Sequence, residues 1–316
     1  MVGRCETLPL LGVGLRRLEQ YARAIIAAII EAKMEETPDK RSKDFKNQPG
    51  ILNTITCGSA AELMNRIPDT SIDLIICDGP YCATEHPWDR IQSIQKYNLE
   101  LIRNFCRILK DGGTAYLFGK HDCLDFIDYR PFLALITRIV WYQPSRLGQG
   151  RKRYTNNYDV IAYFVKDKRA ATFNLDSVRV PQLVELEHRL RCERVPSVRN
   201  GKYGRTKFND KGKNPGDVWG DIKQLTYKSK ELVSREFLNT IQKPERLIER
   251  LVKASSNQGD LILDPFMGTG TTAVVALQLN RYFIGFEMNP HYIEIAEGRI
   301  EETKRKLQSL ETGVKG

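Results

Sequence analysis

The stretch IDLIICDGPYCATEHPWDR, residues 72 to 90, joins an apolar run to a polar loop. Its first six residues form a largely apolar run rich in β-branched side chains, closed by a glycine and a proline, which predicts a buried strand that ends in a tight loop. Asp78 and Tyr81 therefore follow the carboxyl end of a strand. Because ligands bind at that edge of an open α/β sheet, this acid and this aromatic form a candidate site. The simpler interpretation is an ordinary turn that uses Asp, Gly and Pro for their backbone conformations.

A second stretch, LILDPFMGTGTTAVVALQLNRYFIGFE at residues 261 to 287, predicts a strand, a glycine loop, a helix and a second strand that ends in an acid. Such a unit binds a nucleoside, because Gly268 and Gly270 let the backbone approach the ligand and Glu287 can accept hydrogen bonds from ribose hydroxyls. The loop also satisfies G-x-G-x-x-A, which would suit a nicotinamide cofactor. Asp264, however, places a carboxylate where a dinucleotide's pyrophosphate would lie.

Together the two stretches resemble the amino-group DNA methyltransferases that use S-adenosylmethionine, in the permuted order in which the catalytic tetrapeptide precedes the cofactor loop. Four separate elements match the family in one order. They are Asp78-Gly79-Pro80-Tyr81 for its D/N/S-P-P-Y, then Gly216-Asp217-Val218-Trp219, then Gln242-Lys243-Pro244, and finally the glycine loop from Asp264 to Thr272.

The resemblance implies an α/β fold: a doubly wound, mostly parallel sheet of the seven-stranded, Rossmann-like methyltransferase type with an inserted basic recognition region. It implies S-adenosylmethionine as the cofactor and two sets of site residues. The catalytic residues are Asp78, Gly79, Pro80 and Tyr81, and the cofactor-binding residues are Lys243, Asp264, Phe266, Gly268, Gly270, Thr271 and Glu287. The chain departs from the family in having Gly79 where a proline is usual and Ser59 where an acid is common.

The expected reaction is site-specific methylation of adenine N6 in double-stranded DNA. The exocyclic amine of adenine is a poor nucleophile because its lone pair is delocalised into the ring. A carboxylate and a carbonyl that accept hydrogen bonds from the amine would favour a tetrahedral nitrogen, and Asp78 and the carbonyl of Gly79 are the candidates. The base must leave the duplex to reach them, and Tyr81 would stack on it.

Basic charge is concentrated in the middle of the chain. The net charge is +10, and residues 143 to 215 hold 17 Lys or Arg and 7 Asp or Glu, which accounts for the whole excess. Interleaved aromatics favour a polyanion partner over a solvated linker. The candidates for contacts with DNA are Arg146, Arg151, Lys152, Arg153, Arg205 and Lys207.

The sequence predicts four segments. They are an N-terminal amphipathic helix and linker (1–50), the catalytic half of the methyltransferase domain (51–168), a basic target-recognition region (169–213) and the cofactor-binding half (214–316). The N-terminal helix could dock on the domain or on a second copy, so a homodimer is left open. Residues 99 to 109 predict a helix, and Lys110 to Gly113 predict a glycine-type helix end.

The numbers and spacing of cysteines and histidines argue against a disulfide-stabilised fold and against a metal site. The seven cysteines are scattered without a C-x-x-C pair, which favours reduced thiols in the cytoplasm over a disulfide framework or a zinc site. The four histidines show no metal-ligand spacing, so no metal is expected. No apolar run approaches the roughly 20 residues of a membrane span.

Three other functions stay open at this stage. Cytosine N4 is an alternative target within the same family, in which members with Ser at the first catalytic position more often methylate cytosine. A nicotinamide-dependent oxidoreductase would explain G-x-G-x-x-A but neither the basic segment nor the tetrapeptide. A DNA-binding regulator could keep the fold and lose catalysis through Gly79. RNA as a substrate and a cognate restriction endonuclease are left open as well.

Overall fold

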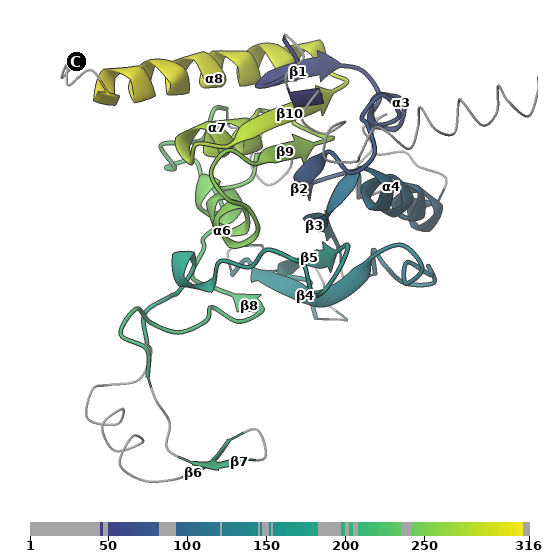
Figure 1. Ribbon diagram of the computed structural model, residues 1–316. Coiled ribbons are helices and arrows are strands. Elements are labelled where there is room, and N and C mark those ends of the chain that lie inside the picture. Colours follow the sequence, from purple (N-terminus) through teal and green to yellow (C-terminus); the bar gives the residue numbers. More distant parts are fainter. Residues whose placement is uncertain are drawn as a thin grey trace, which may run out of the picture.

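An eight-stranded sheet forms the centre of the computed structural model (Figure 1). Its strands, in sheet order, are β1 (Thr54–Cys57), β10 (Tyr282–Glu287), β9 (Leu261–Asp264), β2 (Ile72–Cys77), β3 (Leu109–Gly119), β5 (Tyr158–Val165), β4 (Ala134–Tyr142) and β8 (Val218–Trp219). All of them are parallel except β5, which is antiparallel to both of its neighbours. The predicted doubly wound, mostly parallel sheet is confirmed.

The structure describes residues 45–46, 50–81, 93–120, 122–144, 146, 152, 154–182, 197–199, 202–204, 208–234 and 242–311. The predicted N-terminal amphipathic helix therefore lies outside the described residues. So do four of the predicted DNA contacts, Arg151, Arg153, Arg205 and Lys207.

Helices cover both faces of the sheet. The helices α3 (Ala60–Met64) and α4 (Ile94–Ile108) share one buried cluster with the sheet, and α6 (Glu245–Ser255), α7 (Thr271–Gln278) and α8 (Pro290–Glu311) belong to the other side. Strand β2 lies between the two layers, because Ile75 and Cys77 face the first cluster and Leu74 and Ile76 face the second. A parallel strand that is buried on both faces has a continuous apolar run, which explains the sequence signal at this strand.

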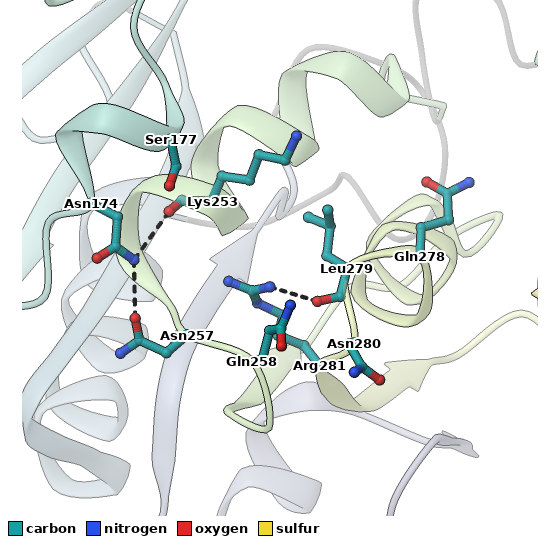
Figure 2. Close-up of a pocket in the computed structure, with 9 residues that line it drawn as sticks. All are labelled: Asn174, Ser177, Lys253, Asn257, Gln258, Gln278, Leu279, Asn280 and Arg281. Carbon is teal, nitrogen blue, oxygen red and sulfur yellow. Dashed lines mark hydrogen bonds between the residues drawn. The ribbon is translucent and has the colours of Figure 1, made fainter. Parts of the chain in front are cut away.

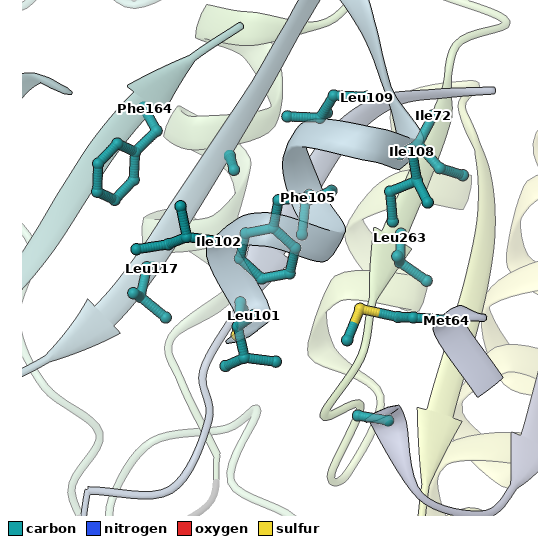
Figure 3. Packing of buried hydrophobic residues seen from close by; sticks show 14 of the residues in the cluster. Met64, Ile72, Leu101, Ile102, Phe105, Ile108, Leu109, Leu117, Phe164 and Leu263 are labelled. Atoms are coloured by element: carbon teal, nitrogen blue, oxygen red, sulfur yellow. The ribbon is translucent and has the colours of Figure 1, made fainter. Parts of the chain in front are cut away.

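The spacing of apolar residues in α4 explains how this helix packs. Its buried apolar side chains recur at helical intervals on one face and lie against β2, β3 and β9 in Figure 3. They are Leu101, Ile102, Phe105 and Ile108. The packing of α4 holds β2 in place on one face of the sheet, and so positions Asp78, the residue that follows β2.

The predicted glycine-type end of α4 is wrong. The helix ends at Leu109 in an extended conformation, with φ −67° and ψ 140°, and β3 begins at the same residue and runs through both glycines. Neither glycine has a left-handed φ. A Cβ at Gly112 would lie 2.9 Å from the carbonyl oxygen of Ala170, and the amide of Thr172 donates to the Gly112 carbonyl at 3.3 Å. Gly112 therefore makes room for the loop after β5 and does not cap a helix.

The inserted region between β5 and β8 has a closed base. Val180 and Lys213 exchange backbone hydrogen bonds of 2.9 and 2.8 Å, and Arg179 donates to the Gly212 carbonyl at 3.1 Å. Further along, β6 (Ser197–Arg199) and β7 (Lys202–Gly204) pair as an antiparallel hairpin that lies away from the sheet in Figure 1. After this insertion β8 returns to the sheet edge beside β4.

None of the described helices combines the length and apolar character that crossing a membrane requires. Four cysteines lie in the described part of the chain, and all of them are free thiols. Within the same residues, no group of three or more His, Cys, Asp or Glu side chains could hold a metal ion.

Candidate active site

Two sequence segments far apart in the chain meet at one edge of the sheet. Strands β2 and β9 are parallel neighbours, and β10 is the next strand on the other side of β9. Their carboxyl ends therefore carry Asp78, the glycine loop (264–272) and Glu287 at the same edge. This is the arrangement that the sequence predicted from two separate strand-to-loop transitions.

The carboxylate of Asp78 has a donor on each oxygen. The ammonium of Lys243 forms an ion pair with Oδ2, and the hydroxyl of Tyr81 donates to Oδ1. The ammonium also lies 5.6 Å from the ring centroid of Tyr81 and 5.6 Å from that of Phe118. Side chains of the ion pair are only 12% and 17% exposed, so the carboxylate is held in one orientation.

Lys243 was predicted to bind the cofactor, and the structure places its ammonium on the predicted catalytic acid instead. The sequence contains no local signal for this contact, because 165 positions separate the two residues. The cofactor contact of Lys243 stays a prediction.

Tyr81 remains protonated at neutral pH. Burial raises the pKa of its hydroxyl well above the usual value, and the nearby carboxylates of Asp78 and Asp159 raise it further. The hydroxyl therefore acts as a hydrogen-bond donor to Asp78. Burial likewise raises the pKa of the Cys77 thiol, which makes it an unsuitable nucleophile.

Gly79 lies directly against the glycine loop. A Cβ built on Gly79 would come within 3.3 Å of the ring of Phe266. The φ of Gly79 is outside the left-handed region, so the backbone does not require glycine at this position. The tetrapeptide (78–81) and the glycine loop are thus in direct contact through Gly79 and Phe266.

If the φ of Gly79 lies near −65°, Gly79→Pro is expected to fold and to raise the free energy of unfolding by about 0.4–1 kcal/mol, because proline restricts the unfolded chain. Turnover should hold or rise. Gly79→Ala is the matched control, since it adds the same Cβ against Phe266 without fixing φ and should gain less. Melting temperature and methylation rate are measured together. A well-folded proline variant with no gain in either quantity would show that Gly79 is not a loosened form of the family's proline.

Asp264 ties the two ends of the glycine loop together. Its Oδ1 accepts from the backbone amide of Phe266 at 2.9 Å, and its Oδ2 accepts from the hydroxyl of Thr272 at 2.5 Å. Burial raises the pKa of this carboxyl to about 7. Within the loop, Gly268 and Gly270 have φ values of 54° and 82°, which explains why both positions are glycine.

Glu287 closes the loop from the end of β10. Its Oε2 accepts from the amide of Gly268 at 2.8 Å, and its Oε1 accepts from the amide of Asn289 at 2.8 Å. Each carboxylate oxygen can accept a further hydrogen bond, so ribose hydroxyls could be bound here.

The chemistry of this edge fits S-adenosylmethionine, which carries a positive sulfonium and two ribose hydroxyls. The acids Asp264 and Glu287 supply negative charge and acceptors, and a nearby cation would lower the raised pKa of Asp264. Thr269, in the same loop, is 1% exposed and its hydroxyl has no hydrogen-bond partner within the described residues. An unsatisfied buried hydroxyl is uncommon and fits a loop built to hold a ligand.

Arg146 lies beside the site in an ion pair. Its guanidinium donates to both oxygens of Asp159, at 2.9 and 3.1 Å, and Gln143 donates to the same carboxylate at 2.7 Å. The sequence analysis did not identify Asp159 or Gln143 as site residues. The signal that could have identified Asp159 is a charged residue near the start of β5, which is otherwise apolar. A DNA contact of Arg146 stays a prediction, and Lys152 is exposed.

A polar pocket of about 620 Å³ lies at the opposite edge of the sheet, before the amino ends of β9 and β10 (Figure 2). It is lined by Asn174, Ser177, Lys253, Asn257, Gln258, Gln278, Leu279, Asn280 and Arg281. Asn174 and Arg281 already donate hydrogen bonds within the protein. Asn174 donates to the Ser256 carbonyl, and Arg281 donates to the Leu279 carbonyl at 2.5 Å. No residue predicted for the site lies there.

Comparison with known families excludes one of the functions that the sequence left open. Residues 72–298 match the DNA methylase family of N6 and N4 methyltransferases. The chain belongs to this family. The match spans both the tetrapeptide and the glycine loop, so the predicted methyltransferase resemblance is confirmed and the oxidoreductase alternative is wrong. S-adenosylmethionine, the predicted cofactor, is confirmed with it.

Named relatives of this DNA methylase cover most of its length. The Type II methyltransferase M.BglII of Bacillus subtilis is 31% identical over 88% of this chain and 76% of its own. The DNA adenine methyltransferase YhdJ of Escherichia coli K12 is 34% identical over 82% of this chain and 89% of its own.

Solved structures support the fold of this DNA methylase. A DNA modification methylase of Thermus thermophilus, TTHA0409, in complex with S-adenosyl-L-methionine, aligns with a TM-score of 0.52 at 20% identity, over 79% of this chain and 93% of its own. The cytosine-N4-specific PvuII DNA methyltransferase aligns with a TM-score of 0.54 at 15% identity, over 81% of this chain and 91% of its own.

Proposed function

We propose that this DNA methylase transfers a methyl group to N6 of adenine in double-stranded DNA. The observation that carries the proposal is the carboxylate of Asp78, oriented by Lys243 and Tyr81 directly beside the glycine loop. Asp at the first catalytic position favours adenine over cytosine. The relative named as a DNA adenine methyltransferase, at 34% identity, supports the same choice.

Asp78 and Gly79 act on the target amine. The carboxylate of Asp78 and the carbonyl of Gly79 accept hydrogen bonds from the NH₂ group, which localises the lone pair on nitrogen and points it toward the glycine loop. When bound there, S-adenosylmethionine supplies a methyl group on a positively charged sulfur. The amine nitrogen would take up this methyl group from sulfur, and Asp78 would accept the surplus proton of the methylated amine.

Lys243 can stay on Asp78 while the base binds. Its ammonium donates to Oδ2 of Asp78 in the free protein, and each carboxylate oxygen can accept a further hydrogen bond. The ammonium and the target amine are both donors, so they can share the carboxylate and keep it ionised.

Tyr81 receives the base after it leaves the duplex. Its ring is fixed by the hydrogen bond of its hydroxyl to Asp78, so the stacking surface and the acceptor are held as one unit. Stacking on an aromatic side chain offsets part of the free energy that unpairing costs.

The basic segment (143–215) binds the phosphates, so DNA affinity is expected to fall steeply with salt as counterions are released. Replacing Arg151, Lys152 and Arg153 together by Gln should reduce the slope of log K against log salt by up to about 0.9 for each phosphate that is no longer neutralised. Fluorescence anisotropy of a labelled duplex at several salt concentrations measures the slope.

The matched control replaces three basic residues of α8, Lys304, Arg305 and Lys306, by Gln, which removes the same charge from another surface. Equal salt slopes for the two triple variants would show that Arg151, Lys152 and Arg153 do not form the phosphate-binding surface.

Two partners are part of the proposal. The Type II methyltransferases among the relatives support a cognate restriction endonuclease for this chain. The homodimer suggested by the N-terminal helix is tested by light scattering of the full chain and of a chain that begins at residue 45.

The experiment that tests the proposal supplies methyl-labelled S-adenosylmethionine together with duplex DNA of mixed sequence, the same DNA as single strands, or duplex RNA. The polymer is then digested to nucleosides. Label on deoxyadenosine from duplex DNA is the expected result. Label on deoxycytidine or on RNA would contradict it.

A further inference from the structure

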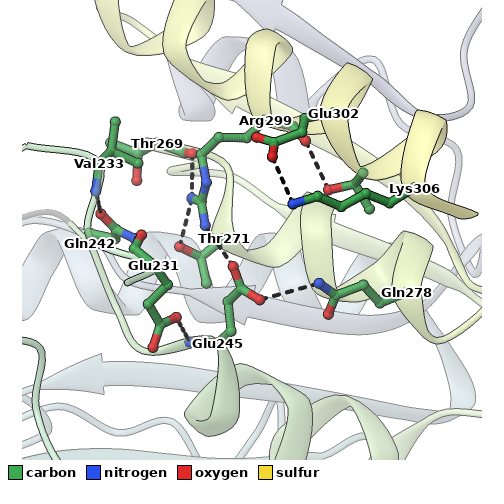
Figure 4. Close-up of polar contacts among 11 residues, drawn as sticks. Glu231, Val233, Gln242, Glu245, Thr269, Thr271, Gln278, Arg299, Glu302 and Lys306 are labelled. Carbon is green, nitrogen blue, oxygen red and sulfur yellow. Dashed lines mark hydrogen bonds and ion pairs between the residues drawn. The ribbon is translucent and has the colours of Figure 1, made fainter. Parts of the chain in front are cut away.

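Arg299, on the buried side of α8, binds the glycine loop from behind (Figure 4). Its Nη1 donates to the carbonyl of Thr269 at 2.7 Å and to the hydroxyl of Thr271 at 3.2 Å, while its Nη2 donates to Oε1 of Glu245 at 3.0 Å. The side chain of Arg299 is 12% exposed. One planar guanidinium therefore joins the glycine loop to the first residue of α6.

Helix α8 is also in direct contact with the loop backbone. A Cβ at Gly270 would come within 2.8 Å of the Cβ of Ala296, which lies one turn before Arg299. A buried backbone carbonyl in this loop needs a donor. Arg299 supplies that donor to Thr269.

Glu245 extends the connection toward the predicted catalytic acid. Its backbone amide donates to Oε2 of Glu231 at 2.8 Å, and its Oε2 accepts from Gln278 at 3.2 Å. Gln242 is fixed in the same network, because its amide nitrogen donates to the Glu231 carbonyl at 2.5 Å and its Oε1 accepts from the Val233 amide at 3.0 Å. The residues on both sides of Lys243 are thus held in place.

Burying the charged guanidinium of Arg299 costs free energy, which argues against an incidental contact with the glycine loop. Burial lowers the pKa of Arg299, and Glu245 opposes that effect. A buried guanidinium is tolerated only when its donors are satisfied, and this one binds a carbonyl, a hydroxyl and a carboxylate.

We infer that Arg299 is a positioning residue that sets the geometry of the glycine loop for the cofactor and, through Glu245, the position of Lys243 against Asp78. The first part rests only on family membership, and the second part rests on the proposed role of Asp78. Arg299 touches neither the cofactor's expected side of the loop nor the target base.

The test uses Arg299→Lys, because a single ammonium cannot reach both the Thr269 carbonyl and Glu245 as the planar fork does. Arg305→Lys is the matched control, since Arg305 is the same residue type on the exposed side of the same helix. S-adenosylmethionine affinity is measured by calorimetry on DNA-free protein, far below the melting temperature. We expect Kd to rise about 10-fold or more for Arg299→Lys, and no change for the control.

A lowered melting temperature with unchanged cofactor Kd would overturn the inference, because a merely structural arginine would give that result. Glu245→Gln, which removes the carboxylate that binds Arg299, tests the second part even if Arg299→Lys does not fold. It is expected to lower turnover at saturating cofactor several-fold while cofactor Kd changes less, and unchanged turnover would overturn the second part.

Failure of this inference is distinguishable from failure of the proposed function. The calorimetry contains no DNA, so its outcome does not depend on which base is methylated. Turnover of Glu245→Gln is measured on whichever nucleoside the wild-type protein labels.

Discussion

Asp78→Ala is expected to abolish methyl transfer, with a loss of turnover of at least roughly 100- to 1,000-fold, while DNA and cofactor affinities stay within a few-fold. The carboxylate acts on the amine of the flipped base and contacts neither the duplex nor the expected cofactor side of the glycine loop. Turnover at saturating substrates and two binding constants are measured for each protein. Equal losses of binding and turnover would count against this role.

The structure adds a control to that experiment. Removing Asp78 leaves the ammonium of Lys243, which is 12% exposed, without its carboxylate, and breaking a buried ion pair costs about 3–5 kcal/mol of stability. Asp78→Ala with Lys243→Met removes the unpaired charge as well. If the double variant regains the melting temperature but not the turnover, the turnover lost in Asp78→Ala is due to the missing carboxylate and not to reduced stability.

Glu287→Gln is expected to weaken S-adenosylmethionine binding by about 10-fold or more, and to slow chemistry at saturating cofactor by much less. Each oxygen of Glu287 now accepts from a backbone amide, one at Gly268 and one at Asn289. An amide side chain has only one oxygen, so its NH₂ would face one of these donors, and a ribose hydroxyl would lose an ionised acceptor.

Glu297→Gln is the matched control, because Glu297 is an exposed acid on α8. Calorimetry with S-adenosylmethionine measures both variants beside the wild-type protein. An unchanged cofactor Kd for Glu287→Gln would remove Glu287 from the site.

The sequence could predict the parts of the site that follow from local patterns. The apolar runs before Asp78 and Asp264 indicated strands buried on both faces, and such strands place the next residue at the ligand edge. The glycines at 268 and 270 were identifiable from their spacing between a predicted strand and a predicted helix, and their positive φ values explain why these positions are glycine.

The contacts that hold the site could not be predicted, because they join elements far apart in the chain. Nothing near Lys243 in the sequence shows that its ammonium reaches Asp78, and Arg299 looks like one charge among many on an amphipathic helix. Lys110 to Gly113 misled the prediction for a related reason. A glycine after a helix usually means a cap, whereas here both glycines lie within β3 and Gly112 makes room for a loop that returns from β5.

Mass spectrometry of nucleosides compares the DNA of cells that express the wild-type chain with the DNA of cells that express Asp78→Ala, in a host without adenine methylation of its own. We expect N6-methyldeoxyadenosine in the first DNA and none in the second. N4-methyldeoxycytidine in the first, or equal N6-methyldeoxyadenosine in both, would contradict the assignment of Asp78 as the acid of an adenine methyltransferase.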